Sequence, residues 1–389
     1  MRKFSATLCT VTLLFASASI ALAQDAETIR AIFASAQKTP TSVGSVSIFA
    51  GPPKGFNALG ATGEELARYG LPQRPDSQAE PQRYAQWARA MSSIRYRAGD
   101  VKALPRHSSP AKLVTPPQTG NAAAQAISNL PVTVGSTNWS GVANVNKLTK
   151  WNVNTSFDEV QSIFVVPSAY TPINACANGI TGPFLASVWN GIDGYNSGDV
   201  VQGGVETYSD CGGAGDNAYL AWVEWYPSYP ELEIVCGGVA CPVTPGDSLY
   251  VVTYATAGTA AQTVFVEKVS AGWEGSFSLP YVQGPGVIGN SEEQVVERPC
   301  CVVVNGIDEP YALNNYDYAY LAEAEGTDGH GTVFYVGEQT TSTYVINMYD
   351  DGITQIISEP IELGSAGNAG KYMLWVSDEG CAYSGGCTP

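Results

Sequence analysis

Histidine is scarce in this chain of 389 residues, which contains only His107 and His330. Neither belongs to an H-E-x-x-H motif or to a His/Cys cluster with zinc-ligand spacing, so the sequence argues against a metallohydrolase and predicts neither a metal nor a cofactor. Asp-Thr-Gly and Asp-Ser-Gly are also missing, which argues against an aspartic-protease dyad. His330 lies in an HGT triplet of the subtilisin type, but the matching GTS-type serine motif is absent.

Long apolar runs are missing after residue 23, so no later stretch is expected to span a membrane. The first 23 residues combine the basic pair Arg2 and Lys3, an apolar run and the small residues that end at Ala23. This pattern is typical of a secretory signal peptide that is removed after Ala23. The sequence therefore predicts a secreted or periplasmic protein.

Positive charge is scarce in the larger part of the chain. Residues 131–389 contain 5 Lys and Arg against 29 Asp and Glu, whereas residues 24–130 contain 12 against 7. The acidic part lacks the clustered cations that bind phosphate, so nucleic-acid and membrane partners are not expected. The balance indicates either an ordinary acidic secreted domain or a domain adapted to acid, where carboxylates lose their charge.

Nine cysteines are present, and Cys9 would leave with the signal peptide. The other eight form an even set, which predicts disulfides in an exported protein. Two local loops are plausible on spacing, and we expect Cys300 and Cys301 to bond elsewhere. The eight residues are Cys176, Cys211, Cys236, Cys241, Cys300, Cys301, Cys381 and Cys387, and the local loops would join Cys236 to Cys241 and Cys381 to Cys387.

The basic residues 24–130 show helical spacing over 26–37, 62–70 and 80–97, followed by a tract rich in Pro, Ser, Ala and Gln at 104–131. We expect that tract to be an exposed linker. A basic helical segment ahead of an acidic exported domain suggests a propeptide that docks by charge and detaches when carboxylates protonate. An independent N-terminal domain or a disordered stalk is the alternative.

Residues 131–389 lose helical periodicity and instead contain short runs rich in Val, Ile, Thr, Tyr and Trp between turn residues. Their length suits a single antiparallel β-sandwich domain. The expected strands lie at 162–167, 219–227, 248–256, 262–269, 332–337 and 372–377.

Strand alternation groups the polar residues of these runs on particular faces. It places Gln202 with Val200 and Gly204, and Glu224 among Trp222 and Tyr226. Farther on, Glu293, Val295 and Glu297 share one face, while Glu292 and Gln294 take the other. A carboxyl group held among aromatic side chains would have a raised pKa and could act as a base or acid, although a solvated strand face explains each glutamate separately.

Several blocks of the acidic part together resemble the eqolisins, the glutamic peptidases. Each block is short, but they follow the family's order and cover nearly all of 131 to about 376. The blocks are NWSG (138–141), FVVP (164–167), SVWNGIDG (187–194), VVQGGV (200–205), AWVEWYP (221–227), PGD (245–247), EEQVVERP (292–299) and LNNYDY (313–318).

The resemblance implies a concanavalin A-like sandwich of two curved antiparallel sheets, preceded by a partly helical propeptide. It also implies secreted endopeptidase activity at acid pH with a catalytic pair that corresponds to Gln202 and Glu293. Trp189, Asp193 and Glu224 fall on motif positions near the active site and are expected to support it. Expected partners are protein or peptide substrates and the chain's own propeptide as inhibitor, and we expect a monomer.

The chain departs from the family pattern at two positions. Gln294 replaces the tryptophan that follows the catalytic glutamate, and Asn190 replaces an apolar residue of the W-x-G-I-D-G motif. Both alternate away from the predicted site, so they should alter packing more than chemistry. A register shifted by one residue would make Glu292 the candidate in place of Glu293, but Glu297 would then lose its match.

The residue types suggest a mechanism that works in acid. Glu293 would act as general base on a water molecule, so its pKa in the free enzyme should not be strongly raised, and hydrogen bonds from Gln202 or the solvent would help to hold it down. Gln202 would donate its amide N–H to the tetrahedral intermediate. Two other classes remain open. A carbohydrate-binding protein or glycoside hydrolase would use Glu293 and Glu224 as a pair, and a binding module would need neither.

Overall fold

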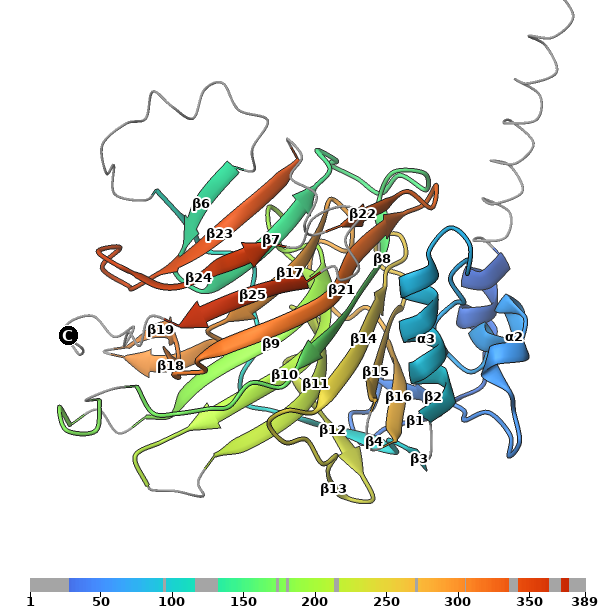
Figure 1. The fold of residues 1–389 in the computed structure, drawn as a ribbon, viewed down its shortest axis with the longest axis horizontal. Helices are drawn as coiled ribbons and strands as arrows, with labels where there is room; N and C mark the ends of the chain where they lie inside the picture. The colour runs from blue at the N-terminus through green and yellow to red at the C-terminus, as the bar shows by residue number, and fades with distance from the viewer. Residues whose placement is uncertain are drawn as a thin grey trace, which may run out of the picture.

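The computed structural model describes residues 28–93, 96–115, 132–172, 175–179, 182–212, 217–269, 272–304, 306–335, 342–363 and 372–377. Within them the chain is a sandwich of antiparallel β-sheets, and the helices belong to the N-terminal segment, residues 28–115 (Figure 1). The predicted all-β sandwich behind a partly helical segment is confirmed. None of the helices in these ranges combines the length and the apolar character that a bilayer crossing requires.

The first sheet carries the candidate site at its centre. Neighbouring strands are antiparallel from β4 to β23, β6 adds to β23 in parallel, and β5 pairs with β6. In spatial order the strands are β4 (Asp100–Ala103), β12 (Leu232–Cys236), β11 (Ala218–Tyr226), β10 (Val200–Ser209), β9 (Phe184–Ile192), β17 (Ser291–Glu297), β7 (Trp139–Val145), β23 (Thr343–Tyr349), β6 (Val132–Ser136) and β5 (Leu113–Val114).

The second sheet packs behind the first, and β24 (Ile356–Leu363) joins the two by pairing with β23 and β25. In spatial order the strands of the second sheet are β25 (Tyr372–Ser377), β21 (Tyr318–Asp328), β8 (Phe157–Val165), β14 (Ser248–Tyr254), β15 (Gln262–Lys268), β16 (Trp273–Leu279), β2 (Ser47–Phe49) and β1 (Lys38–Pro40). The shorter strands are β3 (Tyr96–Arg97), β13 (Val239–Ala240), β18 (Cys300–Val304), β19 (Ile307–Pro310), β20 (Ala312–Leu313) and β22 (Val333–Tyr335). Each of the six strands expected from the sequence is present.

The main core fills the space between the two sheets. Valines of the first sheet, such as Val201 and Val223, meet Val251 and Val264 of the second. The sheets approach closely at Gly203, where a Cβ atom would lie 2.7 Å from a methyl carbon of Val264. A residue with a side chain at this position would force the sheets apart, which explains the glycine beside Gln202.

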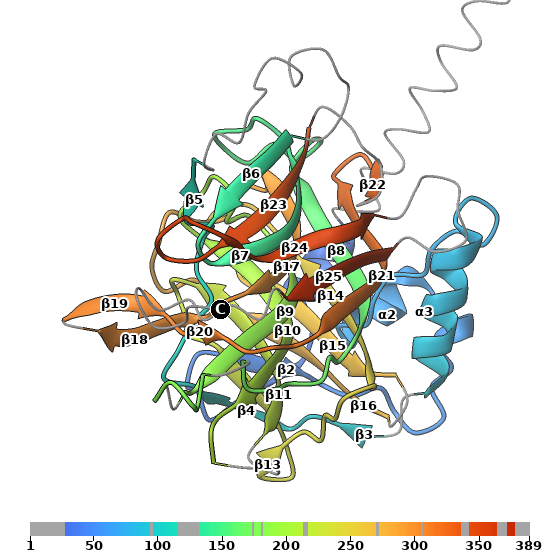
Figure 2. The ribbon, with the colours of Figure 1, turned by 60° about the vertical axis from the view of Figure 1, so that its left-hand side comes forward.

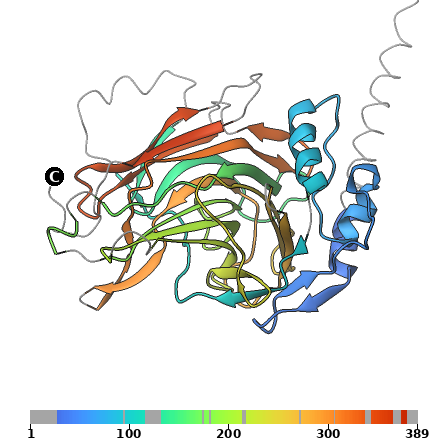
Figure 3. The ribbon, with the colours of Figure 1, turned by 60° about the horizontal axis from the view of Figure 1, so that its bottom comes forward.

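The N-terminal segment covers the outer face of the second sheet (Figure 3). Residues 28–35 are helical, and α2 (Gly63–Arg68), α3 (Pro81–Ser93) and the short 3₁₀ helix η1 (Ala58–Gly60) follow. Thr62 and Glu65 form a capping box at the start of α2, which satisfies free N–H groups of its first turn. The helix expected over 80–97 ends earlier, because Tyr96 and Arg97 pair with β16 as a strand.

The described residues contain three disulfides. The local pair Cys236–Cys241 is confirmed, and Cys176 bonds to Cys211. The expectation that Cys300 and Cys301 bond elsewhere is wrong, because these neighbours bond to each other at the start of β18. Spacing did not indicate this, since the Cα atoms of adjacent residues lie about 3.8 Å apart, closer than the range of about 4.4–6.8 Å usual for a disulfide. The proposed Cys381–Cys387 pair lies outside the described residues.

Candidate active site

The backbone register brings Gln202 and Glu293 to one row of the first sheet. Gln202 lies opposite Gly191 from one side, and Glu293 lies opposite the same glycine from the other. Directly paired residues point to the same face, and strands lie about 4.8 Å apart, so the two backbones are separated by about 10 Å. The two side chains therefore stand on one face with a single glycine position between them, and we call this position above Gly191 the gap.

Gly191 keeps this gap open. A Cβ atom at this position would lie 2.8 Å from the carbonyl oxygen of Val201 and 3.0 Å from Cβ of Gln202. Any side chain on residue 191 would therefore clash with its neighbours and project between Gln202 and Glu293. Steric crowding therefore explains why residue 191, the first glycine of the W-N-G-I-D-G stretch, has no side chain.

Glu224 holds the Gln202 amide. The two residues are directly paired on β11 and β10, and Gln202 Nε2 donates to Glu224 Oε2 over 2.8 Å. Both side chains are fully buried. Gln202 Oε1 has no hydrogen-bond partner within the described residues, so the amide oxygen remains available to a molecule in the gap. This bond fixes the orientation of the Gln202 amide, with Nε2 directed toward Glu224.

Glu293 is held differently from what the sequence suggested. Its Oε1 accepts the backbone N–H of Tyr195 over 3.3 Å, and Oε2 has no partner among the residues described. Burial raises the pKa of Glu293 well above its ordinary value, and the neighbouring Asp193 and Glu292 raise it further. The expectation that the pKa of Glu293 is not strongly raised applies to the free enzyme and stays a prediction. In the full chain the Gln202 amide N–H is bonded to Glu224.

Asp193 supports the site from outside the gap. It has a φ of 68° directly after β9, and its carboxylate accepts the backbone N–H groups of Ile288 and Asn290 over 2.7 and 2.8 Å. Burial, followed by repulsion from Asp199, raises its pKa to about 7. Asp193 therefore fixes the loop that leads into β17 and so positions Glu293.

Trp189 supports the neighbouring row of the same face. Its indole N–H donates to Glu297 Oε2 over 2.9 Å, and its ring packs edge-to-face on Trp139 at 4.9 Å between centroids. Burial raises the pKa of Glu297 to about 8, against backbone and side-chain hydrogen bonds that lower it. Aromatic rings and a buried carboxyl group thus line one side of the gap.

The alternatives raised by the sequence are placed elsewhere. Glu292 is buried on the opposite face, where it accepts the Asn144 amide over 2.5 Å. His330 is exposed in a turn between β21 and β22 of the second sheet. Glu224 and Glu293 share a face, but β10 and β9 lie between their strands, so their backbones are about 14 Å apart. That separation does not favour the carboxyl pair of a glycosidase.

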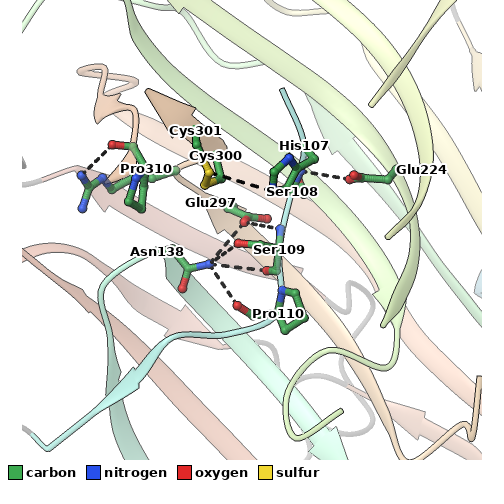
Figure 4. The surroundings of a disulfide bond; sticks show 11 residues. His107, Ser108, Ser109, Pro110, Asn138, Glu224, Glu297, Cys300, Cys301 and Pro310 are labelled. Atoms are coloured by element: carbon green, nitrogen blue, oxygen red, sulfur yellow. Dashed lines mark hydrogen bonds between the residues drawn. A yellow bond between two sulfur atoms is a disulfide. The ribbon is translucent and has the colours of Figure 1, made fainter. Parts of the chain in front are cut away.

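A stretch of the N-terminal segment crosses this face of the first sheet (Figure 4). We call residues 104–112 the crossing stretch. The backbone N–H of Ser108 donates to Glu224 Oε2 over 3.0 Å, and that of Ser109 donates to Glu297 Oε1 over 2.9 Å. The Ser109 carbonyl accepts the indole N–H of Trp139 over 2.9 Å. The expected exposed linker is therefore wrong for this part, because hydrogen bonds bury Ser108 and Ser109 against the sheet.

Arginine anchors the crossing stretch beside the gap. The Arg106 guanidinium makes two bonds to Glu206 and lies 3.7 Å from Glu231 Oε2. Burial raises the pKa of both glutamates, and Arg106 lowers it in part. The sequence reasoning missed Glu206, Glu231 and Asn138 as site residues, although Asn138 belongs to the quoted NWSG block. Only the fold shows that these residues bind the crossing stretch on the face that carries Gln202 and Glu293.

One cluster has the composition of a metal site. Ligand atoms of His107, Cys300 and Cys301 lie within 4.8 Å of one another. Both sulfur atoms are joined in the disulfide, so neither is a thiolate that could bind a metal. In this state the cluster is a packing contact between the crossing stretch and β18.

The first sheet of the sandwich thus carries a polar row in which Gln202 and Glu293 flank Gly191. The model of the Peptidase A4 family matches residues 137–356, more than half of the chain. The chain therefore belongs to this family, the eqolisins, and is a peptide hydrolase.

Similar solved structures include two glutamic peptidases and SCP-B, a member of the eqolisin family of peptidases. Scytalido-glutamic peptidase bound to a peptide-based transition-state analogue has 19% identity and a TM-score of 0.47, covering 62% of this chain and 98% of its own. SCP-B in complex with the tripeptide Ala-Ile-His has 18% identity and a TM-score of 0.46 over the same shares. Aspergilloglutamic peptidase from Aspergillus niger has 24% identity and a TM-score of 0.38, covering 50% and 99%. The curated proteins contain no match.

Proposed function

We propose that this protein is an exported endopeptidase that cleaves peptide bonds in acid with Gln202 and Glu293. The observation that carries the proposal is the shared pairing of both residues with Gly191, which leaves a gap between an amide and a carboxyl group. Glu293 removes a proton from the attacking water and returns it to the leaving amine. Gln202 uses its second amide hydrogen to stabilise the oxygen of the tetrahedral intermediate.

The N-terminal segment supplies the inhibitor in this proposal. The crossing stretch occupies the face on which a substrate would lie, and the backbone N–H groups of Ser108 and Ser109 donate there to Glu224 and Glu297. A buried carboxyl group with a strongly raised pKa keeps its proton in acid and cannot act as a base. Removal of the stretch would readmit water and allow Glu293 to ionise. The same stretch therefore blocks the site and keeps its base inactive.

Charge pairs attach the whole N-terminal segment, including the crossing stretch, to the sandwich. Four arginines from the basic part each contact a carboxylate of the acidic part, which gives the charge asymmetry of the sequence a structural role. The pairs are Arg30 with Asp158, Arg83 with Glu159 and Glu325, Arg97 with Glu274, and Arg106 with Glu206.

The pKa directions argue against release by protonation of all these carboxylates. Burial raises the pKa of both Asp158 and Glu274 to about 7 in the docked segment, despite their arginine partners. A docked state with the higher pKa binds protons more tightly than a solvated carboxylate, so acid strengthens these contacts. The pKa of His107 shifts in the opposite direction. Burial lowers this pKa most, the charge of Lys112 lowers it further, and Asp308 raises it in part. We therefore infer that acid releases the N-terminal segment through protonation of His107 and through cleavage of the segment.

An acid proteolysis assay tests the catalytic pair. Wild type, Gln202→Ala and Glu293→Ala would be incubated at about pH 4 with a denatured protein. Loss of one oxyanion donor lowers the rate on the order of 100- to 1000-fold, and loss of the base should lower it at least as far. Gln283→Ala is the matched control, because Gln283 is exposed and its amide only donates to Pro227. Full activity of either site variant, with a native fold, would refute the pair.

A further inference from the structure

The ring of His107 contacts both an aromatic side chain and a disulfide. It stacks on Tyr226 with 5.2 Å between centroids and 27° between planes. At the ring edge, Nε2 lies 3.9 Å from Sγ of Cys301 (Figure 4). Flat stacking and contact with polarisable sulfur both favour planar side chains over branched aliphatic ones.

The main chain fixes which residue reaches this place. The His107 N–H donates to the Cys300 carbonyl over 2.7 Å, and the Cys300 N–H donates back over 2.7 Å. This antiparallel bridge depends on no side chain, so any extended peptide in the same path can form it. The flanking residues are also held by main-chain groups, because Glu231 N–H donates to the Arg106 carbonyl over 3.2 Å and Ser108 N–H reaches Glu224.

The contact between His107 and Tyr226 lies one residue along the chain from the gap, which relates it to substrate recognition. Ser108, the next residue, donates to the same Glu224 oxygen that accepts the Gln202 amide. A substrate that follows the crossing stretch therefore places one side chain beside Tyr226 immediately before the residue that meets Glu224. Both walls belong to the sandwich, Tyr226 at the end of β11 and the disulfide at the start of β18, so they remain when the segment leaves.

We propose that Tyr226 and the Cys300–Cys301 disulfide form a substrate subsite that selects a planar ring, from His, Phe, Tyr or Trp. The inference rests on the proposed peptidase function and adds a substrate preference to it. Contacts between ring systems are individually modest, so the expected preference for a ring over leucine is about three- to tenfold.

Synthetic nonapeptides with the sequence of residues 104–112 test the subsite. His, Phe, Leu or Ala would stand at the position of His107, and each peptide would compete with denatured protein for the full chain after incubation at about pH 4. We expect the Phe peptide to inhibit about three- to tenfold more strongly than the Leu peptide. The Tyr226→Phe variant should keep this ratio, and Tyr226→Leu should bring it to about one.

The outcomes separate this inference from the proposed function. If the chain cleaves protein but Phe and Leu peptides inhibit equally, or no peptide inhibits, the subsite is refuted and the peptidase function stands. A ratio that survives in Tyr226→Leu also refutes it. If the chain cleaves nothing, the peptidase proposal fails first. Should Tyr226→Leu not fold, the Cys300→Ser/Cys301→Ser double variant removes the other wall and should lower the ratio.

Discussion

Gln294 lies directly opposite Asn190 on neighbouring strands, and both side chains point into the space between the two sheets. Asn190 Nδ2 donates to Ser162 Oγ over 2.8 Å and to the Val251 carbonyl over 3.0 Å. The two departures from the family pattern therefore lie side by side in a polar patch of the core, next to the row of Gln202 and Glu293. Neighbouring polar groups satisfy them, because Asn190 also accepts from Thr253 and Gln294 Nε2 donates to the Gln161 carbonyl over 3.3 Å.

This patch predicts a stability cost for changes at position 190. Asn190→Ala removes the donor to Ser162 and Val251 and leaves the Thr253 hydroxyl, which donates to Asn190 Oδ1 over 3.2 Å, without its acceptor. We expect the free energy of unfolding to fall by about 1–3 kcal/mol. Denaturant unfolding at about pH 4 would measure it, with the exposed Asn154→Ala as control. Equal midpoints for the two variants would show that the patch is not structural.

Glu224 should affect the turnover rate through Gln202. Glu224→Ala removes the acceptor that holds the Gln202 amide, so the amide can rotate away from the gap. We expect kcat to fall by about tenfold or more with a smaller change in KM, because orientation of an oxyanion donor matters most in the transition state. Glu224→Gln retains an acceptor oxygen and should restore much of kcat.

A different pattern would give Glu224 another role. If Glu224→Gln is as inactive as Glu224→Ala, the carboxyl group itself takes part in the reaction and does more than position Gln202. The pH profile of kcat/KM distinguishes the two cases. Substitution of a residue that only positions Gln202 leaves the pKa values of this profile unchanged.

Much of the sheet could be predicted from the sequence, because alternation and β-branched composition are local signals. The faces of Gln202, Glu224 and Glu293 followed from strand periodicity alone. The crossing stretch could not be predicted in this way. Its Pro- and Ser-rich composition is typical of a linker, and its burial depends on partners such as Glu297 and Trp139 that lie far away in sequence. The raised pKa of Glu293 follows from its burial in the fold, which strand periodicity does not show.

Stability should decrease as the pH rises from acid to neutral. Burial raises the pKa of Glu292 to about 8 and the pKa of Glu325 to about 7. The pKa of a glutamate in the unfolded chain is about 4.3. A folded pKa above the unfolded value stabilises the fold fully below pH of about 4, and this contribution is lost as the pH rises toward 8. The melting temperature at pH 4, 6 and 8 should therefore decrease in that order.

Glu292→Gln isolates one of these groups. The substitution keeps an acceptor for the Asn144 amide but cannot ionise, so the variant should gain stability relative to wild type at about pH 8 and little at about pH 4. The exposed Glu64→Gln serves as control. A wild-type melting temperature that increases toward neutral pH would contradict the burial of these carboxyls.

His107 should set the pH at which the N-terminal segment is released. Burial lowers its pKa, so the docked ring is neutral, and protonation below about pH 6.5 opposes its packing on Tyr226. The groups that face it are Lys112, whose charge adds to this effect, and Asp308, which opposes it. His107→Phe keeps the stacked ring but cannot acquire charge, so full-length chain should persist to lower pH and disappear more slowly.

Gel electrophoresis of full-length chain after timed incubation between about pH 3 and 6 would measure this shift. The control is His330→Phe, because His330 is exposed in a turn of the second sheet and should leave the profile unchanged. If His107→Phe is processed at the same pH and rate as wild type, the trigger is not the imidazole. Processing would then depend on the catalytic pair alone, and Glu293→Ala would leave the chain intact at every pH.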